Sequence, residues 1–143
     1  MEFFAKEFSS LGQCELYEIL KSRAEVFLLE QGIICQDMDD VDKESLHCFF
    51  EEKGRVVAYL RAFKTEEDVV TVGRVLTLEH KKGHGRMLME KSIEAIKKHF
   101  DCCKISLHAQ KRSAGFYEKL GFSATSGEFL EAGVVHITME KEI

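Results

Sequence analysis

The 143-residue sequence contains no proline, so glycines and clusters of polar residues must supply its turns and helix ends. It also lacks an excess of basic charge, because 20 lysines and arginines stand against 25 acidic residues and leave a formal net charge of −5. Neutralising the phosphates of a nucleic acid takes a basic face. We therefore expect no nucleic-acid partner.

Long apolar runs are absent as well. No stretch approaches the roughly 18 apolar residues of a membrane-spanning helix, and residues 1–10 lack the basic segment and apolar run of a secretory signal. The five cysteines are odd in number and include no Cys-x-x-Cys pair, a pattern that does not favour a disulfide framework. We expect one soluble, cytoplasmic domain over residues 1–143, with reduced thiols and no membrane partner.

Apolar residues at three- and four-residue steps predict two long helices. The first covers residues 13–31 and stops at Gly32, with an expected buried stripe of Leu16, Tyr17, Leu20, Ala24, Phe27 and Leu28. The second covers residues 85–100, with an expected stripe of Leu88, Met89, Ser92, Ile93, Ile96 and Phe100. A third, short helix is expected at residues 113–120, before Gly121.

The remaining apolar segments read as strands. We expect them at residues 2–8, 47–51, 55–64, 69–78, 104–109, 122–125 and 134–140. Lys53-Gly54 forms a hairpin turn between the second and third, and the third is apolar enough to lie centrally. Gly73 interrupts the fourth and predicts a bulge or a close approach of the backbone. The order of elements predicts an α/β fold whose sheet is mixed, as in α+β proteins. We expect about seven strands flanked by three to four helices.

The loop at residues 79–84 joins a strand to a helix and carries the strongest chemical signal. Glycines at 83 and 85 let the backbone close on an anion, and a helix N-terminus attracts phosphate. Lys81, Lys82 and Arg86 add positive charge. Neither the Walker pattern nor the dinucleotide fingerprint is present. By itself, Gly-His-Gly is equally compatible with a basic loop capped by glycines.

Two motifs together resemble the GNAT acetyltransferases. HKKGHG at 80–85 is similar to that family's pyrophosphate loop, Arg/Gln-x-x-Gly-x-Gly/Ala, and QKRSAGFYEKLGF at 110–122 is similar to its Asn-x-x-Ala-x-x-hydrophobic-Tyr-x-x-x-Gly-Phe signature. His80, Gln110 and Ser113 depart from these patterns. VFLLEQ at 26–31, Gln36-Asp37-x-Asp39, His47, GRV at 73–75 and His136 resemble the ElaA-like branch.

The resemblance implies that acetyl-CoA is the cosubstrate and that it lies where two parallel central strands splay apart. The backbone of Val75, Leu76 and Thr77 would pair with the pantetheine arm. The pyrophosphate would bind the amides of Lys81, Lys82, Gly83, His84, Gly85, Arg86 and Met87. Gln110, Ser113 and Phe116 complete the implied cofactor-binding set, and no metal is implied.

Direct transfer to an amine requires an acid for the departing thiolate and a base for the amine. Tyr117 matches the family's acid; a phenol with a pKa of about 10 can donate to a thiolate whose conjugate acid is near 8.5. Its alternative role is core packing. Glu30 is our first candidate for the base, and His108 and His136 are further candidates. Gln31, Asp37, His108 and His136 are the expected acceptor-binding residues.

The acidic loop at residues 36–44 has two interpretations. Its carboxylates could attract a cationic acceptor, or they could be solvated and paired with arginine. Buried guanidinium groups on Arg61 and Arg74 would need partners such as Asp37 or Asp39, and we expect this structural network.

The sequence alone leaves three functions open. The first is an N-acetyltransferase acting on a primary amine, with a small cationic amine favoured as acceptor. The second is a non-catalytic acyl-CoA-binding module. The third is a nucleotide-phosphate binder of another fold. A homodimer is considered because dimers are the commonest oligomers.

Overall fold

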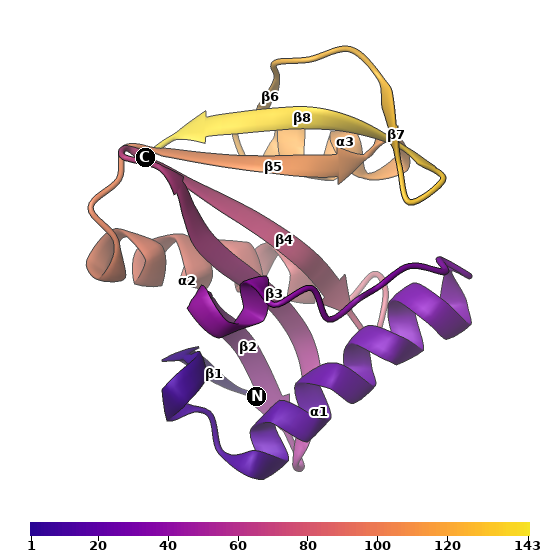
Figure 1. Ribbon diagram of the computed structural model, residues 1–143, viewed down its shortest axis with the longest axis vertical. Coiled ribbons are helices and arrows are strands. Elements are labelled where there is room, and N and C mark those ends of the chain that lie inside the picture. Colours follow the sequence, from indigo (N-terminus) through magenta and orange to yellow (C-terminus); the bar gives the residue numbers. More distant parts are fainter.

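The computed structural model describes all 143 residues as a single mixed sheet with helices on both faces (Figure 1). The elements in chain order are β1 (Glu2–Glu7), the 3-10 turn η1 (Phe8–Ser10), α1 (Gln13–Arg23), the π-helical segment η2 (Ala24–Glu30), the 3-10 turn η3 (Val41–Glu44), β2 (Leu46–Glu52), β3 (Arg55–Glu66), β4 (Val69–Thr77), α2 (His84–His99), β5 (Lys104–Gln110), the 3-10 turn η4 (Lys111–Ser113), α3 (Ala114–Lys119), β6 (Ser123–Ala124), β7 (Phe129–Glu131) and β8 (Val134–Glu142).

The sheet has eight strands in the order β1-β2-β3-β4-β5-β8-β6, with β7 paired to β8. Every pairing is antiparallel except that between β4 and β5. The predicted mixed sheet is confirmed, and β3 lies between two neighbours as its apolar sequence required. Strand β7 was not predicted, because three residues are too few for a periodic pattern.

The parallel strands β4 and β5 separate along their length. They pair only from Val69–Lys104 to Val72–Leu107, although β4 continues to Thr77. Figure 1 shows the two strands together at one end and apart at the other. A bulge helps this divergence: β4 has one residue more than β3 between the paired positions, and Arg74 has φ +55°. The bulge predicted at Gly73 is therefore present, with its strained backbone at the next residue.

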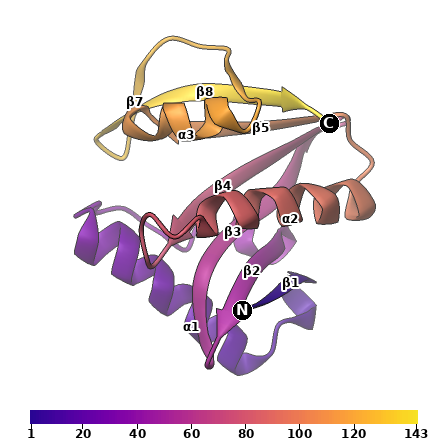
Figure 2. The same cartoon turned by 180° about the vertical axis from the view of Figure 1, so that it is seen from behind.

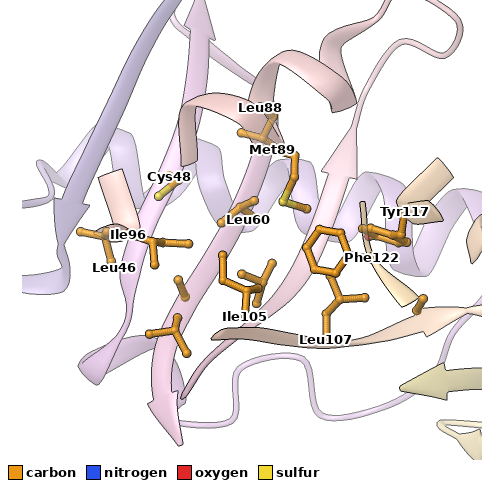
Figure 3. Packing of buried hydrophobic residues seen from close by; sticks show 14 of the residues in the cluster. Leu46, Cys48, Leu60, Leu88, Met89, Ile96, Ile105, Leu107, Tyr117 and Phe122 are labelled. Atoms are coloured by element: carbon orange, nitrogen blue, oxygen red, sulfur yellow. The ribbon is translucent and has the colours of Figure 1, made fainter. Parts of the chain in front are cut away.

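Helices α2 and α3 cover one face of the sheet, and α1 covers the other (Figure 2). The main core lies under α2, where Leu88, Met89 and Ile96 pack on the strands beside Ile105 and Leu107 (Figure 3). The predicted stripe of this helix is confirmed. Full burial of each such side chain contributes about 1.5–3 kcal/mol to folding.

The expected stripe of the first helix was wrong. Tyr17 and Leu28 are exposed, whereas Ile19, Ser22 and Arg23 are fully buried. Ser22 is satisfied by donating to the Val56 carbonyl oxygen at 2.6 Å. Polar groups therefore occupy the inner face because they have partners there, which the apolar pattern could not reveal. None of the helices is both long and apolar enough to span a membrane.

Candidate active site

A cleft of about 510 Å³ opens where β4 and β5 diverge. Its walls come from both strands, the segment after η2, the start of α3 and the β7–β8 hairpin. The structure brings together here a large part of the predicted site, namely Gln31, Asp37, Val75, His108, Gln110, Ser113, Tyr117 and His136.

Tyr117 lines the cleft and is only 7% exposed. Its ring packs edge-on against Phe116 and Phe122, with centroid separations of 5.0 and 5.8 Å. Burial raises the pKa of Tyr117 above its ordinary value. The phenol therefore keeps its proton at neutral pH, which a hydrogen-bond donor in the cleft wall requires.

The edge of β4 that faces β5 has no strand partner beyond Val72. On its other side β4 stays paired, since Leu76 lies opposite Tyr59 and Thr77 opposite Ala58. Backbone amide and carbonyl groups on the open edge need partners other than a strand. An extended ligand lying in the cleft could supply them beside Val75, which lines it.

The glycine-rich loop places a helix N-terminus at the end of β4. Gly83 precedes α2 with φ +76°, a conformation that favours glycine. Its carbonyl oxygen accepts the first helical hydrogen bond from the Met87 amide at 3.2 Å. The amides of His84, Gly85 and Arg86 come earlier and have no partner within the helix. Of the predicted amides, that of Met87 is thus already engaged.

Gly85 lies at the point where the loop, β4 and α3 meet. A Cβ atom there would lie 3.1 Å from Phe116 Cζ and 3.8 Å from Thr77 Cγ2. Phe116 and Thr77 therefore lie beside the loop, although neither lines the cleft itself. Lys81 and Lys82 are exposed. Positive charge and free amides thus meet at one helix end, an arrangement that suits an anion.

Glu30 lies outside the cleft, contrary to what a base for the reaction requires. Its Oε1 is 2.6 Å from His80 Nε2, in a separate surface pocket that His84 also lines. Glu30 and Gln31 are adjacent at the end of η2 and point to different pockets, so only Gln31 reaches the cleft. There Gln31 Oε1 accepts a hydrogen bond from Gln110 Nε2 at 3.0 Å.

The acidic loop is held by arginines, as the structural interpretation expected. Asp37 Oδ1 accepts from Arg74 Nε at 2.8 Å, and Asp37 Oδ2 accepts from Arg23 Nε at 3.0 Å. Arg23 is completely buried on α1 and was not predicted, although its place one turn after Ile19 could have indicated it. Both oxygens of Asp37 are therefore engaged before any acceptor arrives.

Asp39 and Asp42 complete this network. Asp39 receives two 2.7 Å hydrogen bonds from Arg61, which lower its pKa to about 2. Burial tends to raise the pKa of Asp42, but hydrogen bonds from Arg23 and Arg61 outweigh it and lower that pKa. Three arginines thus balance three aspartates, and the network carries no surplus charge.

Glu131, which was not predicted either, lines the cleft from β7. Its Oε1 is 2.9 Å from His108 Nδ1. No periodic signal could have indicated it, because β7 is so short. No group of three or more His, Cys, Asp or Glu side chains could hold a metal ion. The five cysteines are free, and burial raises the pKa of Cys48 to about 12, so its thiol stays protonated.

Comparison with known proteins agrees with this fold and cleft. The family described as "Acetyltransferase (GNAT) domain" matches residues 17–143. A UPF0039 protein of Schizosaccharomyces pombe is 34% identical over 100% of this chain and 98% of its own. The crystal structure of an acyl-CoA N-acyltransferase from Pseudomonas aeruginosa is 30% identical, with a TM-score of 0.91 over 99% of both chains.

The chain belongs to the GNAT acetyltransferase family. Protein ElaA of Escherichia coli is 33% identical to it over 94% of this chain and 92% of ElaA. The crystal structure of E. coli ElaA superposes with a TM-score of 0.91 over 99% of both chains. Within the family, the chain falls in the ElaA-like branch.

Proposed function

We propose that the protein transfers an acetyl group from acetyl-CoA to a primary amine by direct attack of the amine on the thioester. The observation that carries this proposal is the open edge of β4. It runs from the glycine-rich loop into a cleft that contains the buried phenol of Tyr117. Membership of an acetyltransferase family supports the same chemistry.

The cofactor would lie along β4. The edge at Val75–Thr77 would pair with the amide groups of the pantetheine arm, as an added strand does. The pyrophosphate would meet the free amides at the start of α2, with Lys81 and Lys82 nearby. Phe116 would support the loop from behind through its contact at Gly85.

The thioester would then lie near Tyr117 and the start of α3. Attack forms the C–N bond and breaks the C–S bond, and the leaving thiolate takes the Tyr117 proton. Burial raises the pKa of this phenol, so the hydroxyl keeps its proton throughout the neutral range and gives it up only to a strong base such as the departing thiolate. Ser113 and Gln110 line the same part of the cleft.

Calorimetry with acetyl-CoA, CoA and ATP tests the cofactor part of the proposal on wild type, Gly83→Glu and Gly83→Gln. The two variants share the same strain at φ +76° and nearly the same shape, and they differ in charge. We expect acetyl-CoA to bind more tightly than ATP, and Gly83→Glu to lose more affinity than Gly83→Gln. Absence of acetyl-CoA binding by wild type would overturn the proposal.

Turnover of an amine panel, followed by release of free thiol, tests the transfer itself. Acetylation of at least one primary amine is the expected result. A protein that binds acetyl-CoA but acetylates no amine would instead be a binding module.

A further inference from the structure

In its neutral form, His136 directs a hydrogen-bond acceptor toward the carboxylate of Glu131 in the cleft. His136 Nδ1 lies 2.7 Å from the Val134 carbonyl oxygen. Since a carbonyl only accepts, Nδ1 carries the hydrogen, and neutral His136 presents an unprotonated Nε2. That nitrogen is 3.6 Å from Oε2 of Glu131, which is also an acceptor. With His136 neutral, neither atom has a hydrogen to offer the other.

The sheet fixes this arrangement. The turn at Ala132-Gly133 has φ values of +51° and +76° and pairs Glu131 with Val134. His136 lies opposite Phe129, and the two rings stack with centroids 6.0 Å apart. Glu131 and Phe129 are two residues apart, so both lie on the face of the sheet that His136 shares.

His108 holds the carboxylate in place from β5, which lies on the other side of β8 from β7. Its Nδ1 is 2.9 Å from Oε1 of Glu131, and its ring meets Phe129 edge-on at 5.0 Å. Oε1 is therefore occupied, whereas Oε2 is left facing His136. His136 is 7% exposed, so its Nε2 has little access to solvent except through the cleft that both residues line.

Among the carboxylates that line the cleft, Glu131 alone has no arginine or lysine partner. The other charged groups that line it are Asp37, Asp39, Arg61 and Arg74, and all four belong to the balanced arginine–aspartate network. A group that satisfies Oε2 and Nε2 together must donate at least two hydrogen bonds, and the carboxylate favours one that carries positive charge. A primary ammonium group has three donors and meets both conditions.

We propose that Glu131 and His136 form the acceptor subsite, which binds a protonated primary amine, and that His136 is the base that takes its proton. This inference rests on the proposed acetyltransferase function. The ammonium group donates to Oε2 of Glu131 and to Nε2 of His136, and one proton moves to Nε2. The resulting imidazolium is stabilised by Glu131, and His108 acts as a positioning residue for that carboxylate.

The protons of the whole reaction then balance. The first ammonium proton passes to His136 and from there to solvent. The neutral amine attacks the acetyl carbon, the C–S bond breaks, and the thiolate takes the proton of Tyr117. The surplus proton on the new amide nitrogen leaves to water, and a solvent proton restores Tyr117. The net products are an N-acetylated amine, CoA thiol and one proton.

His136→Asn tests the base, because an asparagine amide can still donate to the Val134 carbonyl oxygen. With an aliphatic amine we expect kcat/KM to fall about 100-fold near pH 7. The deficit should shrink as the pH approaches about 10.4, where the free amine loses its own proton. Glu131→Gln should mainly raise the KM of the amine, by about tenfold, because a charged hydrogen bond becomes a neutral one.

His99→Gln is the matched control. His99 also faces a glutamate, with 3.4 Å between its Nε2 and Glu7 Oε1, and neither residue lines the cleft. The His99→Gln variant should therefore leave the kinetics unchanged. The subsite is overturned if His136→Asn matches His99→Gln, if its deficit is the same at every pH, or if it loses acetyl-CoA binding in calorimetry. Wild type that binds acetyl-CoA but acetylates no amine would instead overturn the proposed function.

Discussion

Arg23 holds Asp37 at two points: its Nε donates to the carboxylate at 3.0 Å and its Nη2 donates to the backbone carbonyl oxygen at 2.9 Å. Because Arg74 also contacts both groups of Asp37, the acidic loop is attached to α1 and to the β4 bulge at once. The non-glycine residue with φ +55° at Arg74 is therefore held by side-chain contacts. The loop that walls the cleft is a fixed part of the fold.

Asp42→Ala should strongly destabilise the protein. Asp42 is 7% exposed and accepts from Arg23 and Arg61, so its removal leaves buried guanidinium groups short of a partner. We expect the free energy of unfolding to fall by about 3–5 kcal/mol in urea denaturation. Asp40→Asn, in the same loop but exposed, keeps a residue type that tolerates the local φ of +70° and should change it by less than about 0.5 kcal/mol. Similar losses in the two variants would contradict the network.

Stability should fall on mild acidification because of His47. Burial is the main cause that lowers the pKa of His47, which lies between Tyr59 and the Asp42 carbonyl. The unfolded chain then binds more protons than the folded protein. The contribution of His47 to stability is therefore complete above the pKa of about 6.5 that histidine has in the unfolded chain, and it is lost as the pH falls through the pKa of the folded state. Urea denaturation between pH 7.5 and 5 measures how the free energy of unfolding changes with pH. This change should be smaller in His47→Gln than in wild type or His99→Gln.

Tyr117→Phe should separate catalysis from packing. Phenylalanine keeps the contacts with Phe116 and Phe122 but removes the proton donor, so we expect kcat to fall roughly 100-fold or more with acetyl-CoA affinity retained. Single-turnover kinetics and calorimetry measure the two quantities. Unchanged turnover would assign Tyr117 to the core alone.

Alanine at Gly85 and at Gly115 should have different effects. Both glycines lie in helices, where alanine is favoured by up to about 1 kcal/mol. A Cβ atom at Gly115 meets nothing within 4 Å, but one at Gly85 lies 3.1 Å from Phe116 Cζ. Gly115→Ala should therefore raise the melting temperature, and Gly85→Ala should not. Equal gains would show that the contact with Phe116 adapts freely.

The sequence predicted most of the fold because its long elements carry clear periods. The α2 stripe, the Lys53-Gly54 turn and the central β3 follow directly from local pattern. The inner face of α1 did not, because Arg23 is buried through partners far away in the sequence. Propensity and periodicity contain no information on such pairs.

The site also contains residues that local sequence predicts and residues that it does not. The motif residues Tyr117, Ser113 and Gln110 line one cleft, since their short spacing along β5, η4 and α3 keeps them close together. Glu30 was placed outside it by the π-helical turn, whose 3.0 Å hydrogen bond from the Gln31 amide to Val26 changes the direction of the last residues. The position of Glu131 depends on the pairing of β7 with β8, which the sequence of this three-residue strand does not indicate.

The short ladder between β4 and β5 has a mechanical consequence. Within the sheet, only the pairs from Val69–Lys104 to Val72–Leu107 join the first four strands to the last four. We expect that a small rotation about this ladder changes the width of the opposite end of the cleft without breaking a hydrogen bond within either half of the sheet. Substitutions in the ladder, far from any reacting atom, would then alter how the proposed cofactor and acceptor fit.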